Sequence, residues 1–281
     1  MTLTSHVIKI FERVMRSHLV EYFERNGLFS KRQHGFRSGR STLTQLLGYF
    51  DWVLKALCNG HDTDTVFLDY SRAFDKVDIR LLLVKIRRYG VHPQIVDWLE
   101  SFLTGRKQKV VLDGVQSEIA LIISGVPQGT VLGPLLFLIF INDLEGEALD
   151  AILSFFADDS RVGMEISNEG DTVKLQQDLD RVLQWSTRNN MVLNEDKYEL
   201  MVHHHQRGSL INELPMTGVF YSTSGDTLLA PSDQLRDLGV TVSEDLSWRP
   251  HYVKLTTKGR RMAQWVFGVF SNRDPELMVT G

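Results

Sequence analysis

The chain has 281 residues, of which 43% are hydrophobic and 23% are charged, a composition typical of a globular protein with one large domain or two small ones. Its formal net charge of −4 argues mildly against a nucleic-acid-binding role, although local basic clusters can still create a positive surface. The single cysteine, Cys58, excludes an internal disulfide framework and a cysteine zinc site, and it predicts no disulfide-linked partner.

An amphipathic helix is predicted at the start of the chain. Apolar residues recur at spacings of three and four from Ile8 to Phe23, which predicts a helix over residues 6–25. The Asn-Gly pair at residues 26–27 predicts the end of this helix.

A second helix is expected after a polar, glycine-containing loop at residues 30–42. Ser41 or Thr42 could cap its N-terminus, and apolar residues continue the helical pattern through Val53. Cys58 is predicted to be a small buried residue of this helix rather than a reactive thiol. The use of one cysteine fits a reducing, intracellular compartment.

The next part of the chain predicts strands mixed with helices. Residues 65–70 (TVFLDY) form a short apolar run rich in strand formers, which predicts a buried strand. Helices are predicted around residues 78–89 and 92–103. Residues 108–122 predict a hairpin that turns at residues 113–114 (Asp-Gly).

A long apolar helix is predicted to end near Leu144, after a loop at residues 124–134. Its apolar stretch is shorter than the ~18 residues that cross a membrane, so no membrane span and no membrane partner are predicted. The later elements are a strand–turn–strand unit at 151–166, a helix at 171–189, a strand at 197–203 and a helix from about Trp248. Interleaved strands and helices with an antiparallel hairpin predict an α+β fold.

Two of the predicted strands deliver carboxylates to their ends. Asp69 closes one apolar run, and Asp158 and Asp159 follow another. A turn-capping role or a surface ion pair explains one such residue alone, because unpaired charge in a core costs several kcal/mol. For the pair, a divalent cation is favoured, since it gathers buried carboxylates and removes their repulsion. We therefore expect Mg²⁺ to be shared between Asp69 and Asp158.

Three segments resemble, in order and spacing, the palm motifs of reverse transcriptases: VFLDYSRAFDKVD (66–78, motif A), SGVPQGTVLGPLLFLIFINDL (124–144, motif B) and FFADDSRV (155–162, motif C). Two downstream segments, NNMVLNEDKYELM (189–201) and LRDLGVTVS (235–243), resemble motifs D and E. The wording of motifs A to C and of QHGFRSGRST (33–42) is similar to the non-LTR (LINE-type) retrotransposon branch. The resemblance covers about residues 5–255. A lone Asp-Asp pair would be a weak signal, whereas ordered motifs are specific.

The resemblance implies a right-hand polymerase fold, in which an antiparallel palm sheet is backed by helices. The implied regions are partial fingers at 1–62, palm with motif A at 63–78, a fingers insertion at 79–120, palm with motifs B to E at 121–245 and the start of the thumb at 246–281. The endonuclease that such elements usually carry is not expected in this chain. An intracellular location, in the nucleus and cytoplasm, is implied by analogy with the family.

The resemblance also implies RNA-directed DNA polymerisation with two Mg²⁺ ions, for which Mn²⁺ can substitute, as a primer 3′-hydroxyl attacks a dNTP. Asp69 and Asp158 are the implied metal ligands, and the backbone carbonyl of Tyr70 completes one site. Asp159 is the implied weaker or outer catalytic partner. Lys197, in motif D, is implied to protonate the leaving pyrophosphate.

The implied selectivity for deoxynucleotides depends on Phe74. This residue stands five positions after Asp69, where reverse transcriptases place an aromatic steric gate against a ribose 2′-hydroxyl. In motif B, Gln128 is implied to face the nascent base pair, and Gly129 lets the backbone approach it closely.

Contacts with the triphosphate are expected from arginine, whose planar guanidinium suits phosphate oxygens. Arg37 is the first candidate and Arg40 is the alternative. Arg72 and Ala73 of motif A complete the implied nucleotide-binding set.

The partners that the resemblance implies are an RNA template, a DNA primer and a dNTP. Basic clusters at 85–90, 105–109 and 254–261 are candidates for contacts with nucleic-acid backbones, or else solvated faces. Three histidines at 203–205 predict a loop or strand end rather than a metal site, because successive side chains on a strand alternate.

Two other functions stay open. An RNA-dependent RNA polymerase shares motifs A and C, although Phe74 argues against it. The second alternative is a truncated, inactive retrotransposon remnant that at most binds nucleic acid.

Overall fold

The computed structural model describes residues 5–148, 150–205, 221–223 and 227–269. The chain divides into two compact units, residues 1–231 and residues 232–281. The first unit contains a four-stranded sheet with most of the helices, and it carries the predicted site.

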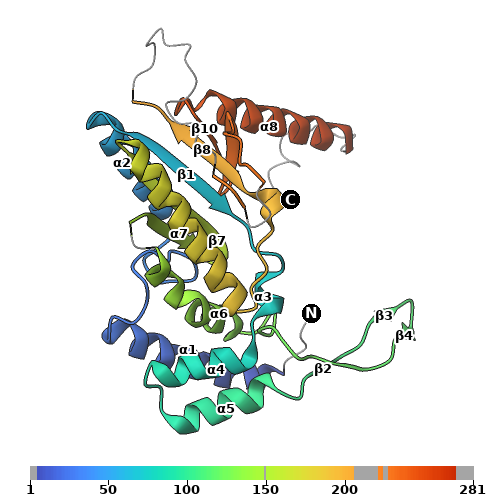
Figure 1. The fold of residues 1–281 in the computed structure, drawn as a ribbon. Helices are drawn as coiled ribbons and strands as arrows, with labels where there is room; N and C mark the ends of the chain where they lie inside the picture. Colours follow the sequence, from blue (N-terminus) through green and yellow to red (C-terminus); the bar gives the residue numbers. More distant parts are fainter. Residues whose placement is uncertain (1–4, 149, 206–220, 224–226, 270–281) are drawn as a thin grey trace. The chain divides into compact units, whose positions relative to one another are not determined.

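The sheet of the first unit is antiparallel throughout (Figure 1). Its strands are β1 (Asp62–Leu68), β6 (Ile152–Phe156), β7 (Asp159–Ile166) and β8 (Glu199–His203), in the order β6-β7-β1-β8. The predicted strands at 151–166 and 197–203 are therefore confirmed, and the motif A strand lies between those of motifs C and D.

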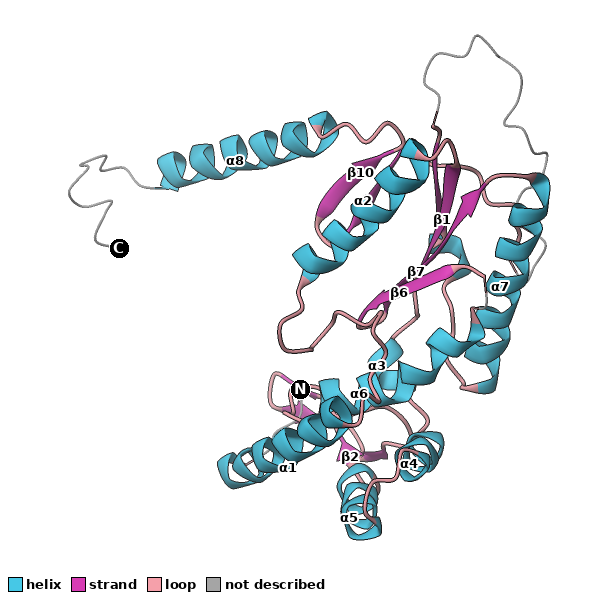
Figure 2. Ribbon diagram, turned by 90° about the vertical axis from the view of Figure 1, so that its left-hand side faces the viewer, coloured by secondary structure: helices cyan, strands magenta, loops and turns pink. Residues whose placement is uncertain are grey.

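The two faces of this sheet are covered by different helices (Figure 2). On one face, Val66 pairs with Val162, and both belong to the apolar core with Leu175 of α7 (Glu169–Arg188). On the other face, α2 (Thr42–Cys58) packs so closely that a Cβ at Gly163 would lie 2.9 Å from Trp52. Alternation of side chains along each strand thus gives two buried faces.

The remaining helices of the first unit include α6 (Gly133–Ile141), whose side chains from Leu135 to Ile141 are all buried. A helix that is apolar on every side is stable only inside a protein core. The helices of this part are α1 (His6–Arg25), the short α3 (Ala73–Lys76), α4 (Ile79–Arg88) and α5 (Pro93–Leu103). The helices predicted at 6–25, 78–89, 92–103 and 171–189 are confirmed within one or two residues.

The predicted hairpin at residues 108–122 is confirmed as a ribbon that projects beyond α4 and α5 (Figure 1). Its strands are β2 (Lys107–Gln108), β3 (Val111–Leu112), β4 (Val115–Gln116) and β5 (Ala120–Leu121). It turns at Asp113 and Gly114, with φ angles of 49° and 82°. Positive φ at both central residues is the turn that an Asp-Gly pair favours.

The second unit begins with a hairpin of β9 (Gln234–Asp237) and β10 (Val240–Ser243), which spans the motif E segment. The helix predicted from about Trp248 follows as α8 (Arg249–Val269). The predicted thumb range of 246–281 extends beyond residue 269, outside the described residues.

Three predictions about these elements were wrong in detail. Strand β1 begins at Asp62 rather than at Thr65, because the polar segment 62–64 pairs with β7, and residues 63–64 also pair with β8. The apolar α-helix ends at Ile141, and a 3₁₀-helix (Asn142–Glu147) follows. Cys58 is exposed rather than buried, because it lies on the last turn of α2.

Of the described helices, none is both long and apolar enough to span a membrane.

Candidate active site

The predicted catalytic carboxylates lie at the ends of the two central strands of the sheet, β1 and β7. Asp69 directly follows β1, and Asp158 lies in the two-residue loop between β6 and β7. Leu68 pairs with Ser160, so the antiparallel register places the end of β1 beside the start of β7. Burial raises the pKa of Asp158, and the neighbouring negative charge of Asp69 raises it further. The Asp69 and Asp158 carboxylates are therefore close enough for the charge of one to affect the other. Asp159 is exposed at the first position of β7.

The segment after β1 is held by the motif D loop. Asn194 donates its backbone N–H to the carbonyl of Asp69 at 2.8 Å, and Ser71 donates to the carbonyl of Val192 at 2.8 Å. These bonds place Lys197 near the site, where its Nζ lies 3.1 Å from Oδ2 of Asp69. The two predicted catalytic residues of motifs A and D are therefore in contact.

The donor groups fit a divalent cation with oxygen ligands. Carboxylate oxygens of Asp69 and Asp158, with the nearby backbone of Tyr70, are hard oxygen donors of the kind that Mg²⁺ prefers. Among the described residues, no cluster of three or more His, Cys, Asp or Glu side chains is arranged to hold a metal. Mg²⁺ suits such a small donor set, because it takes few protein ligands and keeps water or phosphate oxygens for the rest.

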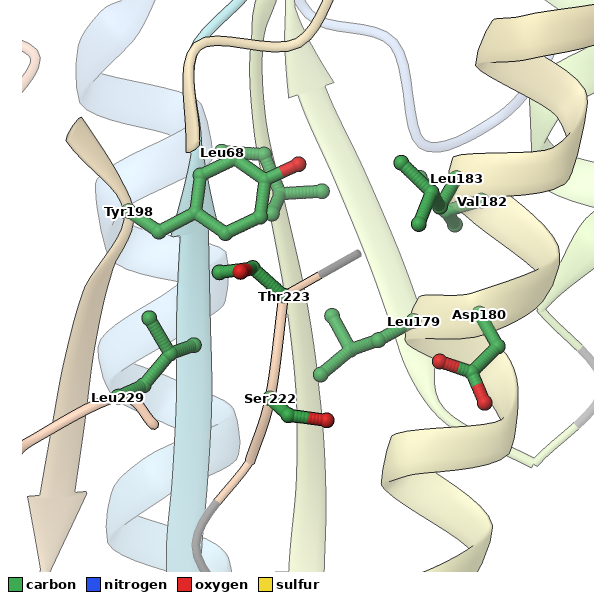
Figure 3. A pocket seen from close by; sticks show the side chains of 9 residues that line it. All are labelled: Leu68, Leu179, Asp180, Val182, Leu183, Tyr198, Ser222, Thr223 and Leu229. Atoms are coloured by element: carbon green, nitrogen blue, oxygen red, sulfur yellow. The ribbon is translucent and has the colours of Figure 1, made fainter. Parts of the chain in front are cut away.

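Apolar packing behind β1 supports the site from within the core. Figure 3 shows Tyr198, Leu179 and Leu229 around Leu68, the residue before Asp69. The space between them is a cavity of only about 10 Å³, too small for more than one water molecule. Close packing of this kind limits movement of the strand end that carries Asp69.

The predicted steric gate lies on a rigid aromatic support. The ring of Phe74 stacks on Phe137 of α6 with 4.2 Å between centroids and an interplanar angle of 17°. Phe36 of the 33–42 loop meets Phe74 edge-on at 6.2 Å. The Phe74 ring is therefore held between motif B and the 33–42 loop.

The turn before Phe74 contains the other predicted residues of motif A. Arg72 has a φ of 53° and an exposed side chain, and Ala73 begins α3 with 2% of its surface exposed. A left-handed arginine is strained by about 1 kcal/mol or more, and such strain is common at functional sites. Their contacts with a nucleotide stay a prediction.

Gln128 is held by a residue that the sequence analysis missed. Its Nε2 donates to Oδ1 of Asp75 at 2.8 Å, and Ser124 Oγ donates to the carbonyl of Asp75 at 2.9 Å. Gly129 has a φ of +79° and open space where a Cβ would lie, so glycine is favoured there by its backbone conformation. Motifs A and B are thus tied together beside Phe74.

The predicted triphosphate arginine is engaged elsewhere in this structure. Arg37 makes an ion pair with Glu24 at 2.7 Å and donates to the carbonyl of Ser30 at 2.6 Å. Arg40, the alternative, donates to the carbonyl of Lys31 at 2.6 Å. Both arginines therefore stabilise the 30–42 loop, and binding of a triphosphate by either stays a prediction.

One predicted basic cluster is partly buried. Lys85 is 8% exposed and donates to the Phe140 carbonyl and to Asp143, each at 2.7 Å. This lysine is therefore unsuited to a backbone contact with nucleic acid. At residues 203–205, His203 ends β8, and His204 and His205 both contact Asp62, so the prediction of a strand end is confirmed.

Sequence reasoning also missed Gln33 and Gly35, which contact the motif C turn through Ala157. In the 33–42 segment, the sequence predicts a role at the site only for Arg37 and Arg40. Gln33 gives no local signal of its contact, because Ala157 is 124 residues away in the sequence.

The comparisons with known proteins agree with this arrangement. The family described as "Reverse transcriptase (RNA-dependent DNA polymerase)" matches residues 1–242. The RNA-directed DNA polymerase from mobile element jockey of Drosophila funebris is 31% identical over 258 residues, 88% of this chain and 27% of that protein. The probable RNA-directed DNA polymerase from transposon X-element of Drosophila melanogaster is 32% identical over 201 residues, 70% of this chain and 22% of that protein.

Solved structures show the same fold at low sequence identity. Telomerase from Candida albicans, in complex with a TWJ fragment of telomeric RNA, aligns with a TM-score of 0.57 and 12% identity over 85% of this chain and 38% of that chain. Apo telomerase from Candida tropicalis, truncated from its C-terminal domain, gives a TM-score of 0.56 and 13% identity over 84% of this chain and 44% of that chain. The predicted α+β palm fold is therefore confirmed.

Proposed function

Because this chain belongs to the reverse transcriptase (RNA-dependent DNA polymerase) family, we propose that its carboxylate site adds deoxynucleotides to a DNA primer paired with an RNA template. Its relatives are polymerases of Drosophila mobile elements, which places it in the non-LTR retrotransposon branch. The chain spans 27–28% of the length of its jockey relatives, so the activity of the whole protein is part of the proposal.

The observation that carries the proposal is the meeting of Asp69 and Asp158 where the central strands β1 and β7 adjoin, with the motif D lysine in contact with Asp69. Burial and the negative charge of Asp69 raise the pKa of Asp158, and the Lys197 ammonium group contacts the Asp69 carboxylate. Reverse transcriptases use divalent metal ions, and two Mg²⁺ ions, or Mn²⁺, are proposed here. When bound, such ions activate the attacking hydroxyl and stabilise charge on the leaving oxygen.

The protein side chains divide the remaining work. Asp69 and Asp158 supply oxygen ligands and hold negative charge where β1 and β7 adjoin. Phe74 limits the space beside the sugar, and Gln128, fixed by Asp75, is available to the nascent base pair. Lys197 is close enough to Asp69 to deliver a proton to the leaving pyrophosphate.

The proposed partners are an RNA template, a DNA primer and a dNTP. Exposed Arg88 and Lys109 are available for phosphate contacts, in contrast with the buried Lys85. One structural neighbour is a telomerase in complex with a fragment of telomeric RNA, which supports nucleic-acid binding for this fold. By analogy with the family, we also propose an intracellular location, in the nucleus and cytoplasm.

Primer extension tests the proposal. A DNA primer annealed to an RNA template is incubated with dNTPs and Mg²⁺ or Mn²⁺, using the native chain, Asp158→Asn and the control Asp150→Asn. Asp150 is exposed just before β6, so its substitution removes the same charge outside the site. We expect incorporation by the native chain and the control, and a loss of about 100-fold or more in Asp158→Asn.

Equal incorporation by Asp158→Asn and the native chain would contradict the assignment. Preferential use of rNTPs would favour an RNA polymerase instead. Salt-dependent RNA binding without incorporation, unchanged in Asp158→Asn, would support a remnant that only binds nucleic acid.

A further inference from the structure

The loop that carries Asp158 has an unfavourable backbone conformation. Phe156 pairs with Asp159, so Ala157 and Asp158 form a two-residue hairpin loop. Ala157 has a φ of 57°, in the left-handed region that glycine usually fills at such a turn. For alanine this conformation costs about 1–2 kcal/mol, so the surrounding structure must hold it in place.

The side chain of Gln33 supplies that support. Its Oε1 accepts the backbone N–H of Ala157 at 2.9 Å, and its Nε2 donates to the carbonyl of Ala157 at 3.3 Å. Oε1 also accepts the N–H of Gly35 at 2.6 Å. Gln33 is 3% exposed and Ala157 is 5% exposed, so these bonds form away from water. One amide group therefore satisfies both backbone groups of the strained residue.

The position of Gln33 is itself fixed by the sheet. The backbone N–H of His34 donates to the carbonyl of Phe155 at 2.9 Å, and the N–H of Phe155 donates to the carbonyl of Arg32 at 3.1 Å. Residues 32–34 therefore pair along the edge of β6, as an isolated parallel bridge between Gln33 and Phe155. This pairing aims the Gln33 side chain at the turn that follows β6.

A second feature shows how closely the loop approaches the turn. A Cβ at Gly35 would lie 2.4 Å from the backbone nitrogen of Ala157, a distance that real Cβ atoms do not adopt. Gly35 thus permits the contact by having no side chain. Gln33 and Gly35 both contact the backbone of Ala157, so they act on the turn that carries Asp158 rather than on the reacting atoms.

We propose that Gln33 is a positioning residue of the polymerase site: it clamps the Ala157 backbone and thereby fixes the direction of the Asp158 carboxylate. The inference rests on the proposed function for its catalytic consequence, but the clamp itself is a property of this chain. Residues that orient metal ligands typically change metal affinity by about 10- to 100-fold when they are substituted. Gln33 acts in this way through the backbone, across 124 residues of sequence.

The test compares Gln33→Met, which keeps the side-chain length but removes both hydrogen-bonding groups, with Gln176→Met. Gln176 is a half-buried glutamine of α7 whose amide also binds both backbone groups of one residue: its Oε1 accepts the N–H of Ser222 at 2.8 Å, and its Nε2 donates to the Ser222 carbonyl at 3.2 Å. These bonds lie outside residues 153–162, so the substitution measures the cost of losing such an amide away from the clamp. Gln33→Asn, which keeps the amide but is too short to reach both groups, is the second variant.

The first two readouts need no turnover. Hydrogen exchange of the peptide that spans residues 153–162 should accelerate in Gln33→Met and stay near the native rate in Gln176→Met. Mn²⁺ affinity, measured by electron paramagnetic resonance, should fall by about 10-fold or more in Gln33→Met, as in Asp158→Asn. Gln33→Asn should lie between these values.

The third readout is primer extension. We expect kcat to fall by about 10- to 100-fold in Gln33→Met, with a higher Mg²⁺ requirement and a dNTP KM within about 3-fold of the native value. A residue with a structural role alone would lower the unfolding temperature without changing kcat and the Mg²⁺ requirement in this way, as Gln176→Met is expected to do.

The outcomes separate the two proposals. Native exchange rates and native Mn²⁺ affinity in Gln33→Met, or equal losses in Gln176→Met, would overturn the clamp. If exchange and Mn²⁺ binding change as expected while no chain incorporates dNTP, the clamp is supported and the proposed polymerase activity fails.

Discussion

The ammonium nitrogen of Lys197 lies 3.1 Å from Oδ2 of Asp69, so the lysine of motif D contacts the first carboxylate of motif A. Both side chains are partly exposed, at 64% and 36%. Solvent screens such a pair, so it contributes little to folding. Its position next to the carboxylates of the proposed metal site favours a role in the reaction instead.

Substitution of Lys197 by Gln should therefore separate activity from stability. We expect single-turnover incorporation to fall by about 10²-fold or more, because a general acid is lost. The free energy of unfolding should change by less than about 1 kcal/mol. Rapid-quench kinetics and urea unfolding measure the two effects.

Lys174→Gln is the matched control, because Lys174 pairs with Asp171 at 2.9 Å on α7, outside the site. A similar loss of incorporation in both variants would contradict the assignment of Lys197.

Phe74→Val should weaken the selection of deoxynucleotides. The ring is held by Phe137 and Phe36, so its removal leaves space that these neighbours do not readily fill. We expect the efficiency ratio of rNTP to dNTP use to rise by about 10-fold or more. Steady-state kcat/KM for each nucleotide on the same primed RNA gives this ratio.

Phe36→Leu tests whether the support matters, because Phe36 meets the gate edge-on. A smaller rise in the ratio is expected from it. An unchanged ratio in Phe74→Val would show that another group excludes the 2′-hydroxyl.

The sequence predicted the site better than it predicted the supports of the site. Ordered motifs placed Asp69, Asp158 and Lys197 in one region, and the structure shows Lys197 on Asp69. The spacing of hydrophobic residues also predicted the strands and helices, because an element that buries one face or both faces has a characteristic spacing of apolar residues in the sequence. The early start of β1 was missed, because Asp62 and Asp64 are held by pairing with neighbouring strands rather than by propensity.

Long-range contacts explain why the supporting roles of Gln33 and Asp75 were missed. Gln33 and Ala157 are 124 residues apart, and nothing local indicates that one supports the other. Asp75 looks like an ordinary helix residue until its bond with Gln128 is seen. Cys58 fits an apolar pattern, yet it lies on an exposed turn at the end of α2.

His34 should make the fold sensitive to acid. Burial, together with the positive charges of Arg40, Arg161 and Arg37, lowers its pKa to about 4. The folded chain therefore binds this proton less readily than the unfolded chain, whose histidine has the ordinary value of 6.5. Stability is retained above pH 6.5 and is lost as the pH falls toward 4.

His34→Gln should remove this part of the pH dependence. Urea midpoints at pH 7 and pH 5 should differ less in His34→Gln than in the native chain, whereas substitution of the exposed His18 should change nothing. Equal pH dependence in the native chain and His34→Gln would contradict this assignment.

Lys85→Ala should destabilise the fold without weakening nucleic-acid binding. The Lys85 ammonium group is bonded to Asp143 and to the Phe140 carbonyl, and it lies 4.8 Å from the Trp185 ring centroid. Its removal leaves these acceptors without their cation, at a cost of about 2 kcal/mol, which urea unfolding would show as a lower midpoint. Arg88→Ala, on the exposed end of α4, is the control and should leave stability nearly unchanged. If Lys85→Ala instead reduced RNA affinity at constant stability, the buried lysine would have to leave its pocket to bind, and its structural role would be wrong.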